Sequence, residues 1–548
     1  MRVKRILLSA TSGLLLLFCA ISHALAAQTP QHGGTIVTVP GVGLGPPAAI
    51  NGFNYLLTSS EYDFQAENIM YQPLLWIDGH QQVDWKQSIA SGIKIGPDHR
   101  TYTITLSKKW HWSDGKPVTA QDVAYTYRMI VKLGSKFPNY GTGGIPTDVA
   151  TVKVLGPYRL EIVTKQPVNA DWFELNGISL LTPLPAHAWS AYSVKQLYDK
   201  LTNVGFFKVV DGPFKLQTFE TGRYASFVPN PRYSGNTKPY IDKLVIRFLS
   251  TPQAVFSALR TGEIQIGNLP YQLYPARRQL ASLHTTITAP SWGFGYVGFN
   301  FSNPSIAYLR DARVRQAIMH ALDQKLMIKV LYYGHGAPDF GPVPPVPATF
   351  LSPAAKQLRQ QGAYDPALSK KLLKEAGWKP GPDGYLVKNG HRLSFTTYVP
   401  PGSTREPTLI KAMLAKVGID MHISEKPFNQ IIAQTSDPAN HTWQSIYLAW
   451  TLSSYPSGET IWNCGGAFNA YHYCNKKMDR LITASTSHSG LDPLYRYQDY
   501  FTQQQPVVVL PAYDHIIKSS PLIHGVRKAF PPSGLMAPQY LWIAKNSH

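Results

Sequence analysis

The chain has 548 residues and a formal net charge of +20, from 52 basic and 32 acidic residues. This length is too great for one compact core, so two or three lobes are expected. The basic residues are scattered, and no zinc-finger, helix-turn-helix or RNA-binding motif accompanies them. Nucleic acid is therefore not an expected partner. The shortage of Asp and Glu suggests instead a protein that works in an acidic compartment.

The N-terminus is typical of a secretory signal peptide. Three basic residues among the first five precede an apolar run over 6–21, and Ala24-Leu25-Ala26 follows as a cleavage signal. A signal peptide over 1–27 is predicted, and a lipid anchor at Cys19 is the alternative. No later run reaches the roughly 18–20 apolar residues that span a bilayer. We expect export to the periplasm.

The stretch from Tyr102 to Ile130 predicts a strand, a tight turn and a helix in succession. Apolar residues alternate over 102–106, and Ser113-Asp114-Gly115 is a turn sequence. Thr119, three residues before Asp122, predicts a capped helix start. The stretch contains no catalytic arrangement, and its two tryptophans are expected to pack against the turn: Trp110 and Trp112.

Strands and punctuated helices alternate along the rest of the chain. One helix is predicted to begin at Thr251-Pro252 and to end at Gly262. Another is predicted to begin at Asp365-Pro366 and to end before Gly377. A further helix is predicted over 407–417, followed by Gly418 and a strand over 421–424. This alternation predicts an α/β protein with mixed sheets.

Several motifs recur in the order found in one family of proteins. They are NIMYQPLLWIDG (68–79), the stretch 102–130, DGPFKL (211–216), VPNPRY (228–233), KLVIRFLSTPQAVFSALRTGEIQIG (243–267), FNFSNP (299–304), LRDARVRQAIMHALDQKLMI (309–328), GHGAPDFGPVPP (334–345), YDPALSKKLLKEAGW (364–378) and KAMLAKVGIDMHI (411–423). The series resembles the peptide-type (family 5) extracellular solute-binding proteins of ABC transporters, which include dipeptide- and oligopeptide-binding proteins. It spans essentially the whole mature chain.

The resemblance implies a periplasmic-binding-protein-like fold of type II, with two lobes, an accessory domain and a hinge that closes on a buried ligand. The expected division is a signal peptide at 1–27, a first segment of lobe I at 28–66, the accessory domain at 67–194, a second segment of lobe I at 195–287, lobe II at 288–511 and the C-terminal return to lobe I at 512–548. It also implies a small-molecule or peptide ligand and permease subunits in the inner membrane as partners. We further expect a monomer with no cofactor, catalytic residue or metal.

The expected ligand wall lies in SIYLAWTLSSYP (445–456), where Trp450 ends an alternating apolar strand. In peptide-binding members an Asp stands three residues after this Trp and binds the terminal ammonium of the ligand. Here Ser453 holds that position, or Ser454 if one extra residue is allowed for, and Glu459 further along the loop is a possible replacement. A hydroxyl binds an ammonium more weakly than a carboxylate does, so peptides with a free amine are less favoured.

Further candidate ligand residues come from other segments. Arg405, in the loop PPGSTREP, resembles the region where dipeptide-binding relatives hold the ligand carboxylate, and a guanidinium can clamp a carboxylate through two bonds. Because Arg405 is present and the aspartate is absent, an anionic or neutral ligand is expected. The remaining candidates are Trp292 and Phe294 beside the expected crossing, and Asn68 and Tyr71 from the first lobe.

After cleavage two cysteines remain, Cys464 and Cys474, with His472 between them. In an oxidising compartment such a pair predicts a disulfide, whereas two thiols and one imidazole form an incomplete zinc set.

No enzyme motif is found. The sequence GFGYVG (293–298) matches a dinucleotide-binding pattern literally but lies in an apolar strand. A secreted hydrolase acting on oligosaccharide or peptide, and a periplasmic chaperone, are the alternatives to a binding protein.

Overall fold

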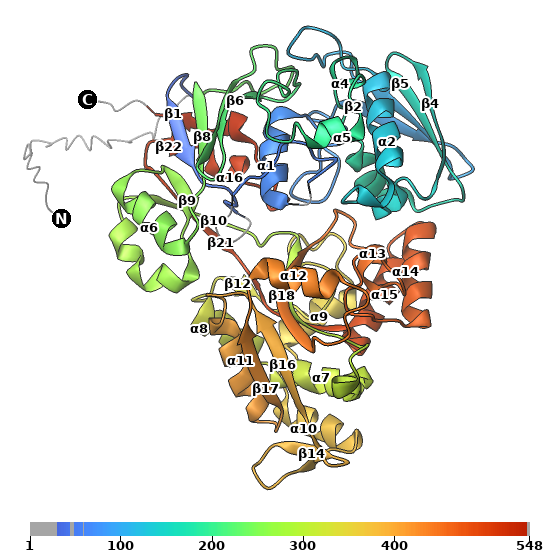
Figure 1. The fold of residues 1–548 in the computed structure, drawn as a ribbon, viewed down its shortest axis with the longest axis vertical. Helices are drawn as coiled ribbons and strands as arrows, with labels where there is room; N and C mark the ends of the chain where they lie inside the picture. Colours follow the sequence, from blue (N-terminus) through green and yellow to red (C-terminus); the bar gives the residue numbers. More distant parts are fainter. Residues whose placement is uncertain (1–29, 44–48, 59, 545–548) are drawn as a thin grey trace, which may run out of the picture.

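The computed structural model describes residues 30–43, 49–58 and 60–544, so the predicted signal peptide and Cys19 lie outside the described residues. Figure 1 shows an upper body with two large sheets and a lower body with one, joined by chain segments that cross between them. In the described stretches of the chain, no helix has the length and apolar character needed to cross a membrane.

Lobe I is built on the sheet β1-β8-β7-β6, at the upper left of Figure 1. Its strands are β1 (Thr35–Thr38), β6 (Phe214–Glu220), β7 (Tyr224–Pro229) and β8 (Lys243–Arg247). β1 pairs parallel with β8, and the other neighbours are antiparallel. The lobe also contains α1 (Glu61–Met70), α6 (Pro252–Thr261), α16 (Val526–Ala529) and the small sheet of β9 (Ile266–Asn268), β10 (His284–Thr288) and β21 (His515–Ser519).

The antiparallel sheet β2-β3-β5-β4 lies at the upper right of Figure 1, within the region predicted as the accessory domain (67–194), and we use that name for it below. Its main elements are β2 (Ala90–Ile95), β3 (Thr101–Leu106), α2 (Ala120–Leu133), β4 (Val149–Gly156), β5 (Arg159–Thr164), α3 (Ala170–Trp172), η3 (Phe173–Gly177) and α4 (Ala186–Trp189).

The predicted strand, turn and capped helix are confirmed there. Asp122 Oδ2 accepts a hydrogen bond from the backbone N of Thr119 at 2.8 Å, which closes the cap of α2. Trp110 and Trp112 are fully buried behind the turn.

Lobe II is built on the mixed sheet β17-β16-β18-β11-β19. Its strands are β11 (Gly293–Phe299), β16 (Ser394–Val399), β17 (Asp420–Glu425), β18 (Ser445–Thr451) and β19 (Val507–Val509). β16 runs parallel to β17 and β18, whereas β11 is antiparallel to β18 and β19. The principal helices are α7 (Ala312–Ala321), α8 (Gln324–Leu331), α9 (Pro353–Gln361), α10 (Pro366–Glu375), α11 (Arg405–Ala415), α14 (Lys476–Ser487) and α15 (Asp492–Gln504).

Helix boundaries follow the predicted signals closely. α6 and α10 begin at the predicted prolines, and Gly262 and Gly377 adopt positive φ just after them. α11 begins at Arg405, two residues before the predicted start, because Pro407 is tolerated in the first turn of a helix. The literal dinucleotide pattern is contained in β11, so no helix follows it to hold a phosphate.

The chain crosses between the bodies twice. It leaves β10 at Thr288 and enters β11 at Gly293, and it returns from β19 at Val509 to β21 at His515 through the short β20 (Ala512–Tyr513). β20 pairs with β12 (Gly336–Ala337) of lobe II.

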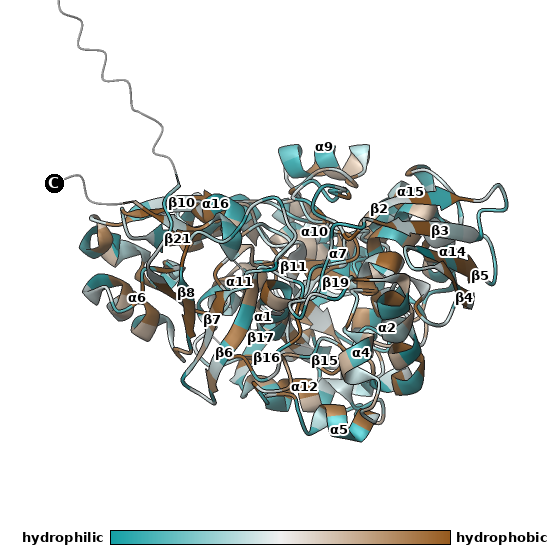
Figure 2. Ribbon diagram, turned by 90° about the horizontal axis from the view of Figure 1, so that it is seen from above, coloured by the Kyte–Doolittle hydropathy of each residue, from teal (hydrophilic) through white to brown (hydrophobic). Residues whose placement is uncertain are grey.

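One buried apolar cluster extends from lobe I through the accessory domain into lobe II, where it includes Phe294, Ile446 and Phe501, and a second lies within lobe II and includes Val297, Phe395 and Met413. In Figure 2 brown and teal residues are mixed along the strands, whereas α9, which projects from one side, is mostly teal. The continuity of the first cluster means that the accessory domain and lobe II are in contact in this structure.

Candidate functional site

A cavity of about 220 Å³ lies between the lobes, beside the returning crossing segment. Lobe I contributes Val39, Pro40, Pro252, Val255, Asn268, Leu269, Pro270, Tyr271, Gln272 and, from β21, His515 and Ile516. Lobe II contributes Leu331, Tyr332, Gly402, Ser403, Arg405, Glu406 and Tyr447, and the crossing adds Tyr513 and Asp514. Drug-sized sites have volumes of roughly 300–1,000 Å³, so this cavity suits one residue or one compact group of a solute.

Glu406 is the buried acidic residue in the cavity wall. It lies in the first turn of α11, with 7% of its surface exposed. Its Oε2 accepts hydrogen bonds from the hydroxyls of Tyr332 and Tyr447, both at 2.7 Å. Its Oε1 is buried and has no hydrogen-bond partner among the described residues. Burial raises the pKa of Glu406, and the two tyrosine hydroxyls oppose that rise.

Three more aromatic contacts complete this wall. Tyr332 stacks on Tyr513 with ring centroids 4.7 Å apart, and Tyr271 meets both rings edge-on at 5.2 and 5.8 Å. The hydroxyl of Tyr271 donates to the carbonyl of Asp514 at 2.8 Å. Burial lowers the pKa of the neighbouring His515 to about 4, so this imidazole is neutral at pH 7.

Arg405, the predicted carboxylate clamp, lines the same cavity from an exposed position. Its Nη2 donates to the carbonyl of Val330 at 2.8 Å and its Nη1 to that of Leu331 at 3.4 Å, and the guanidinium lies over the ring of Tyr333. These are carbonyls at the C-terminus of α8, which a cation normally stabilises. The guanidinium therefore caps the C-terminus of α8, and Arg405 also lines the cavity.

The predicted Trp450 wall lies on the other face of β18. Trp450 is half-buried, donates from Nε1 to the hydroxyl of Tyr471 at 2.8 Å and contacts Phe468. Ser453 is exposed and Ser454 half-buried in the loop that follows. None of these residues lines the 220 Å³ cavity. Because side chains alternate along a strand, the cavity receives Tyr447 from the opposite face.

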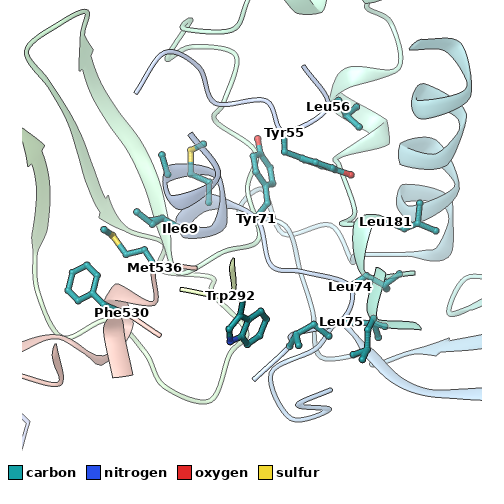
Figure 3. Close-up of a cluster of buried hydrophobic side chains, with 14 of the residues drawn as sticks. Tyr55, Leu56, Ile69, Tyr71, Leu74, Leu75, Leu181, Trp292, Phe530 and Met536 are labelled. Carbon is teal, nitrogen blue, oxygen red and sulfur yellow. The ribbon is translucent and has the colours of Figure 1, made fainter. Parts of the chain in front are cut away.

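The remaining predicted ligand residues lie elsewhere. Trp292 and Tyr71 belong to the buried apolar cluster drawn in Figure 3, and Phe294 stacks on Trp462 within the same core. Asn68 donates from Nδ2 to the carbonyl of Phe64 one turn earlier in α1. The structure does not bring these four residues into the cavity with Arg405. Their roles in ligand binding stay predictions.

The two cysteines are joined by a disulfide. The loop between Cys464 and Cys474 carries Phe468 and Tyr471, the two residues that hold Trp450. The crosslink therefore fixes the surroundings of that indole.

Replacing both cysteines by Ser is expected to lower the free energy of unfolding by about 2–3 kcal/mol, because a closed loop of this length restricts the unfolded chain. Urea denaturation followed by tryptophan fluorescence measures the change, and wild-type protein treated with a thiol reductant serves as the control. Identical midpoints for all three samples would contradict the expectation.

A second contact joins the accessory domain to lobe II. Asn169, buried before α3, donates from Nδ2 to the carbonyls of Ser485 at 3.0 Å and His488 at 2.8 Å, and to the hydroxyl of Tyr455 at 3.2 Å. Asn176 exchanges two hydrogen bonds of 2.8 Å with the backbone of Tyr455. We call Asn169, Asn176 and their partners the interlobe latch.

Glu459, considered above as a replacement for the missing aspartate, takes part in the same contact. Its Oε1 accepts from Trp172 Nε1 at 3.0 Å and from the backbone N of Gly143 at 3.4 Å, and its Oε2 accepts from the hydroxyl of Ser457. Glu459 thus has partners from both sides of the contact.

Sequence reasoning missed Glu406 and the tyrosines around it. An acidic residue at a helix start is an ordinary helix signal, so Glu406 did not stand out beside Arg405. Tyr447 lies on β18, a strand that was predicted correctly, but on the face opposite to Trp450, which was the predicted ligand residue. Tyr271, Tyr332 and Tyr513 come from segments far apart in the chain, and no local pattern connects them.

Comparison with known proteins identifies the family. The model of the bacterial extracellular solute-binding proteins, family 5 (middle region), matches residues 84–471. The oligopeptide-binding protein AppA of Bacillus subtilis is 27% identical over 469 residues, with 84% of this chain and 82% of that protein covered. The glutathione-binding protein GsiB of Salmonella choleraesuis is 26% identical over 471 residues, covering 83% and 82%.

Solved structures of other proteins have the same fold. The structure of Bacillus subtilis AppA in complex with a nonapeptide has a TM-score of 0.74 at 24% identity, covering 94% of this chain and 100% of that one. The substrate-binding protein CtaP of Listeria monocytogenes has a TM-score of 0.78 at 20% identity, with the same coverage. The predicted two-lobed α/β fold with mixed sheets is confirmed. The chain belongs to the bacterial extracellular solute-binding proteins of family 5.

Proposed function

We propose that this protein is the periplasmic substrate-binding component of an ABC importer, and that it captures a peptide or peptide-like solute between its lobes. The observation that carries the proposal is the cavity beside the crossing segments, whose wall is drawn from both lobes. The names of the oligopeptide- and glutathione-binding relatives support a solute of this class.

Capture works through a shift between conformations. A solute that contacts Tyr271 of lobe I and Glu406 of lobe II makes both contacts only when the lobes are together, so binding favours the closed form. The closed form is then recognised by permease subunits in the inner membrane, and the solute is released without any covalent change. The protein acts as a monomer in this scheme.

Closure on an unchanged solute is the expected result of a direct test. Native mass spectrometry of freshly purified protein is expected to detect a co-purified solute. After this solute is removed, small-angle scattering should show a smaller radius of gyration when it is added back. Mass analysis of the released solute should give the same mass before and after incubation. Identical scattering profiles, or a chemically altered solute as a hydrolase would produce, would contradict the proposal.

A further inference from the structure

The charges around the cavity favour a positively charged group in it. Glu406 and Asp514 are its two acidic lining residues, and Arg405 is its one basic lining residue. The guanidinium of Arg405 is bonded to the carbonyls that end α8, and His515 is neutral at pH 7. The buried acidic group that lines the cavity and has one oxygen without a partner is therefore Glu406.

We propose that Glu406 is the specificity-determining residue of this cavity and that it binds a basic nitrogen of the solute, a protonated amine or a guanidinium, through its Oε1. This inference rests on the proposed function, since it assigns the chemistry of the solute that the same cavity takes. It differs from the expectation of an anionic or neutral ligand, which was based on Ser453 and Arg405.

The hydrogen bonds of Glu406 support this assignment. Tyr332 and Tyr447 both donate to Oε2, so they hold the carboxylate in a fixed orientation and leave the buried Oε1 without a donor. A buried carboxylate oxygen without a donor is costly, and an N–H donor that carries a positive charge forms the strongest bond with it. A protonated amine supplies both the donor and the compensating charge.

The aromatic wall adds a second reason. Tyr271, Tyr332, Tyr447 and Tyr513 all line the cavity, and tyrosine rings attract cations at short range. An aromatic wall alone would also accept a quaternary ammonium group. The unpartnered Oε1 requires a hydrogen-bond donor, which a quaternary ammonium lacks, so an N–H-bearing cation is favoured.

Four tripeptides test the proposal by isothermal titration calorimetry on the mature protein freed of its co-purified solute. They are Ala-Ala-Ala, its N-acetyl form, N-acetyl-Ala-Lys-Ala and N-acetyl-Ala-Glu-Ala, so that amine, neutral and acidic groups are compared on one scaffold. At least one of the two amine-bearing peptides is expected to bind tenfold or more tightly than both acetylated peptides without an amine. This comparison needs no variant protein.

Glu406→Gln then assigns the preference to one residue. The variant is expected to lose at least tenfold in affinity for the preferred amine peptide and to change affinity for N-acetyl-Ala-Ala-Ala by less than about threefold. Glu406→Asp keeps the charge and should retain some of the preference. Glu375→Gln removes a carboxylate at the exposed end of α10 and should change neither affinity. Thermal melting of each variant without peptide verifies that it is folded.

Each outcome decides the proposal. If wild-type protein binds a neutral or acidic peptide as tightly as the amine peptides, or if folded Glu406→Gln keeps the amine preference, Glu406 has a structural role only and the proposal is overturned, while the proposed function stands. If none of the four peptides binds or changes the scattering profile, the peptide-like solute class fails first and this inference fails with it.

Discussion

Replacing Asn169 by Ala is expected to weaken solute binding about thirtyfold and to shift the protein toward an open form. The side-chain Nδ2 of Asn169 lies within hydrogen-bond distance of three acceptors in lobe II, two of them backbone carbonyls, which share its two N–H groups. These carbonyls would be left without this donor in the closed form, whereas in the open form water can reach them. The loss is about 2 kcal/mol, which corresponds to roughly thirtyfold in an equilibrium constant.

The effect reaches the binding site through the conformational equilibrium. The latch contacts join the accessory domain to lobe II, so we expect them to break when these two parts separate and to stabilise the closed form. If the latch is weakened, a smaller fraction of the protein is closed before the solute binds. The apparent affinity for a solute that binds the closed form falls accordingly. Asn169 does not line the cavity, so the variant changes no direct solute contact.

Calorimetry with the co-purified solute and small-angle scattering without it measure the two consequences. Thr486→Ala is the matched control, because Thr486 joins the contact through its backbone carbonyl, which accepts from the Asn169 backbone N at 2.8 Å. That variant should resemble wild type. An Asn169→Ala protein with unchanged affinity and an unchanged radius of gyration would show that the latch does not control closure.

Acidification from pH 8 to pH 5 is expected to raise the free energy of unfolding. Burial raises the pKa of Asp63 to about 6 and that of Glu174 to about 7, and it holds the pKa values of Glu67 and Asp211 well above their usual range. In the unfolded chain such carboxyls titrate near pH 4. The folded state therefore holds protons that the unfolded state releases.

This difference in bound protons sets the direction in which the free energy of unfolding changes with pH. The contribution of each raised carboxyl is fully present below about pH 4 and is lost as the pH rises through 6 for Asp63 and 7 for Glu174. Each contributes on the order of 1–3 kcal/mol, with Glu174 discounted for its partial exposure. His515 acts in the opposite direction, because its pKa is lowered to about 4 and its stabilising effect is lost as the pH falls from 6.5 toward 4. The pKa values of His472 and His524 are also lowered by burial and act in the same direction as His515. The four raised carboxyls outnumber these three imidazoles, so stability is expected to rise overall.

Urea midpoints at pH 5, 6, 7 and 8 measure this trend. Glu174→Gln should flatten it between pH 5 and pH 8, and Glu161→Gln, on the half-exposed face of β5, should not. A sharp loss of stability between pH 7 and pH 5 would contradict the expectation. It would also count against the acidic compartment suggested by the low content of Asp and Glu.

Local signals predicted the elements well because their causes lie within a few residues. The Thr119 cap, the proline starts of α6 and α10 and the glycines that end them all act through backbone bonds one turn away. The order of motifs along the chain was enough to predict the family, and with it the two-lobed fold. These features depend on sequence neighbours or on sequence order alone.

The sequence by itself thus determined the family, the lobed α/β architecture and the positions of helices such as α2 and α10. Only the tertiary structure decided which side chains meet between the lobes. Glu406 gained its significance because Tyr332 and Tyr447 donate to one of its oxygens and leave the other without a partner, and those tyrosines are 74 and 41 residues away. The contact of Asn169 with Tyr455 spans 286 residues. Burial and hydrogen-bond satisfaction depend on what the fold brings alongside a residue, and no window of sequence contains that information.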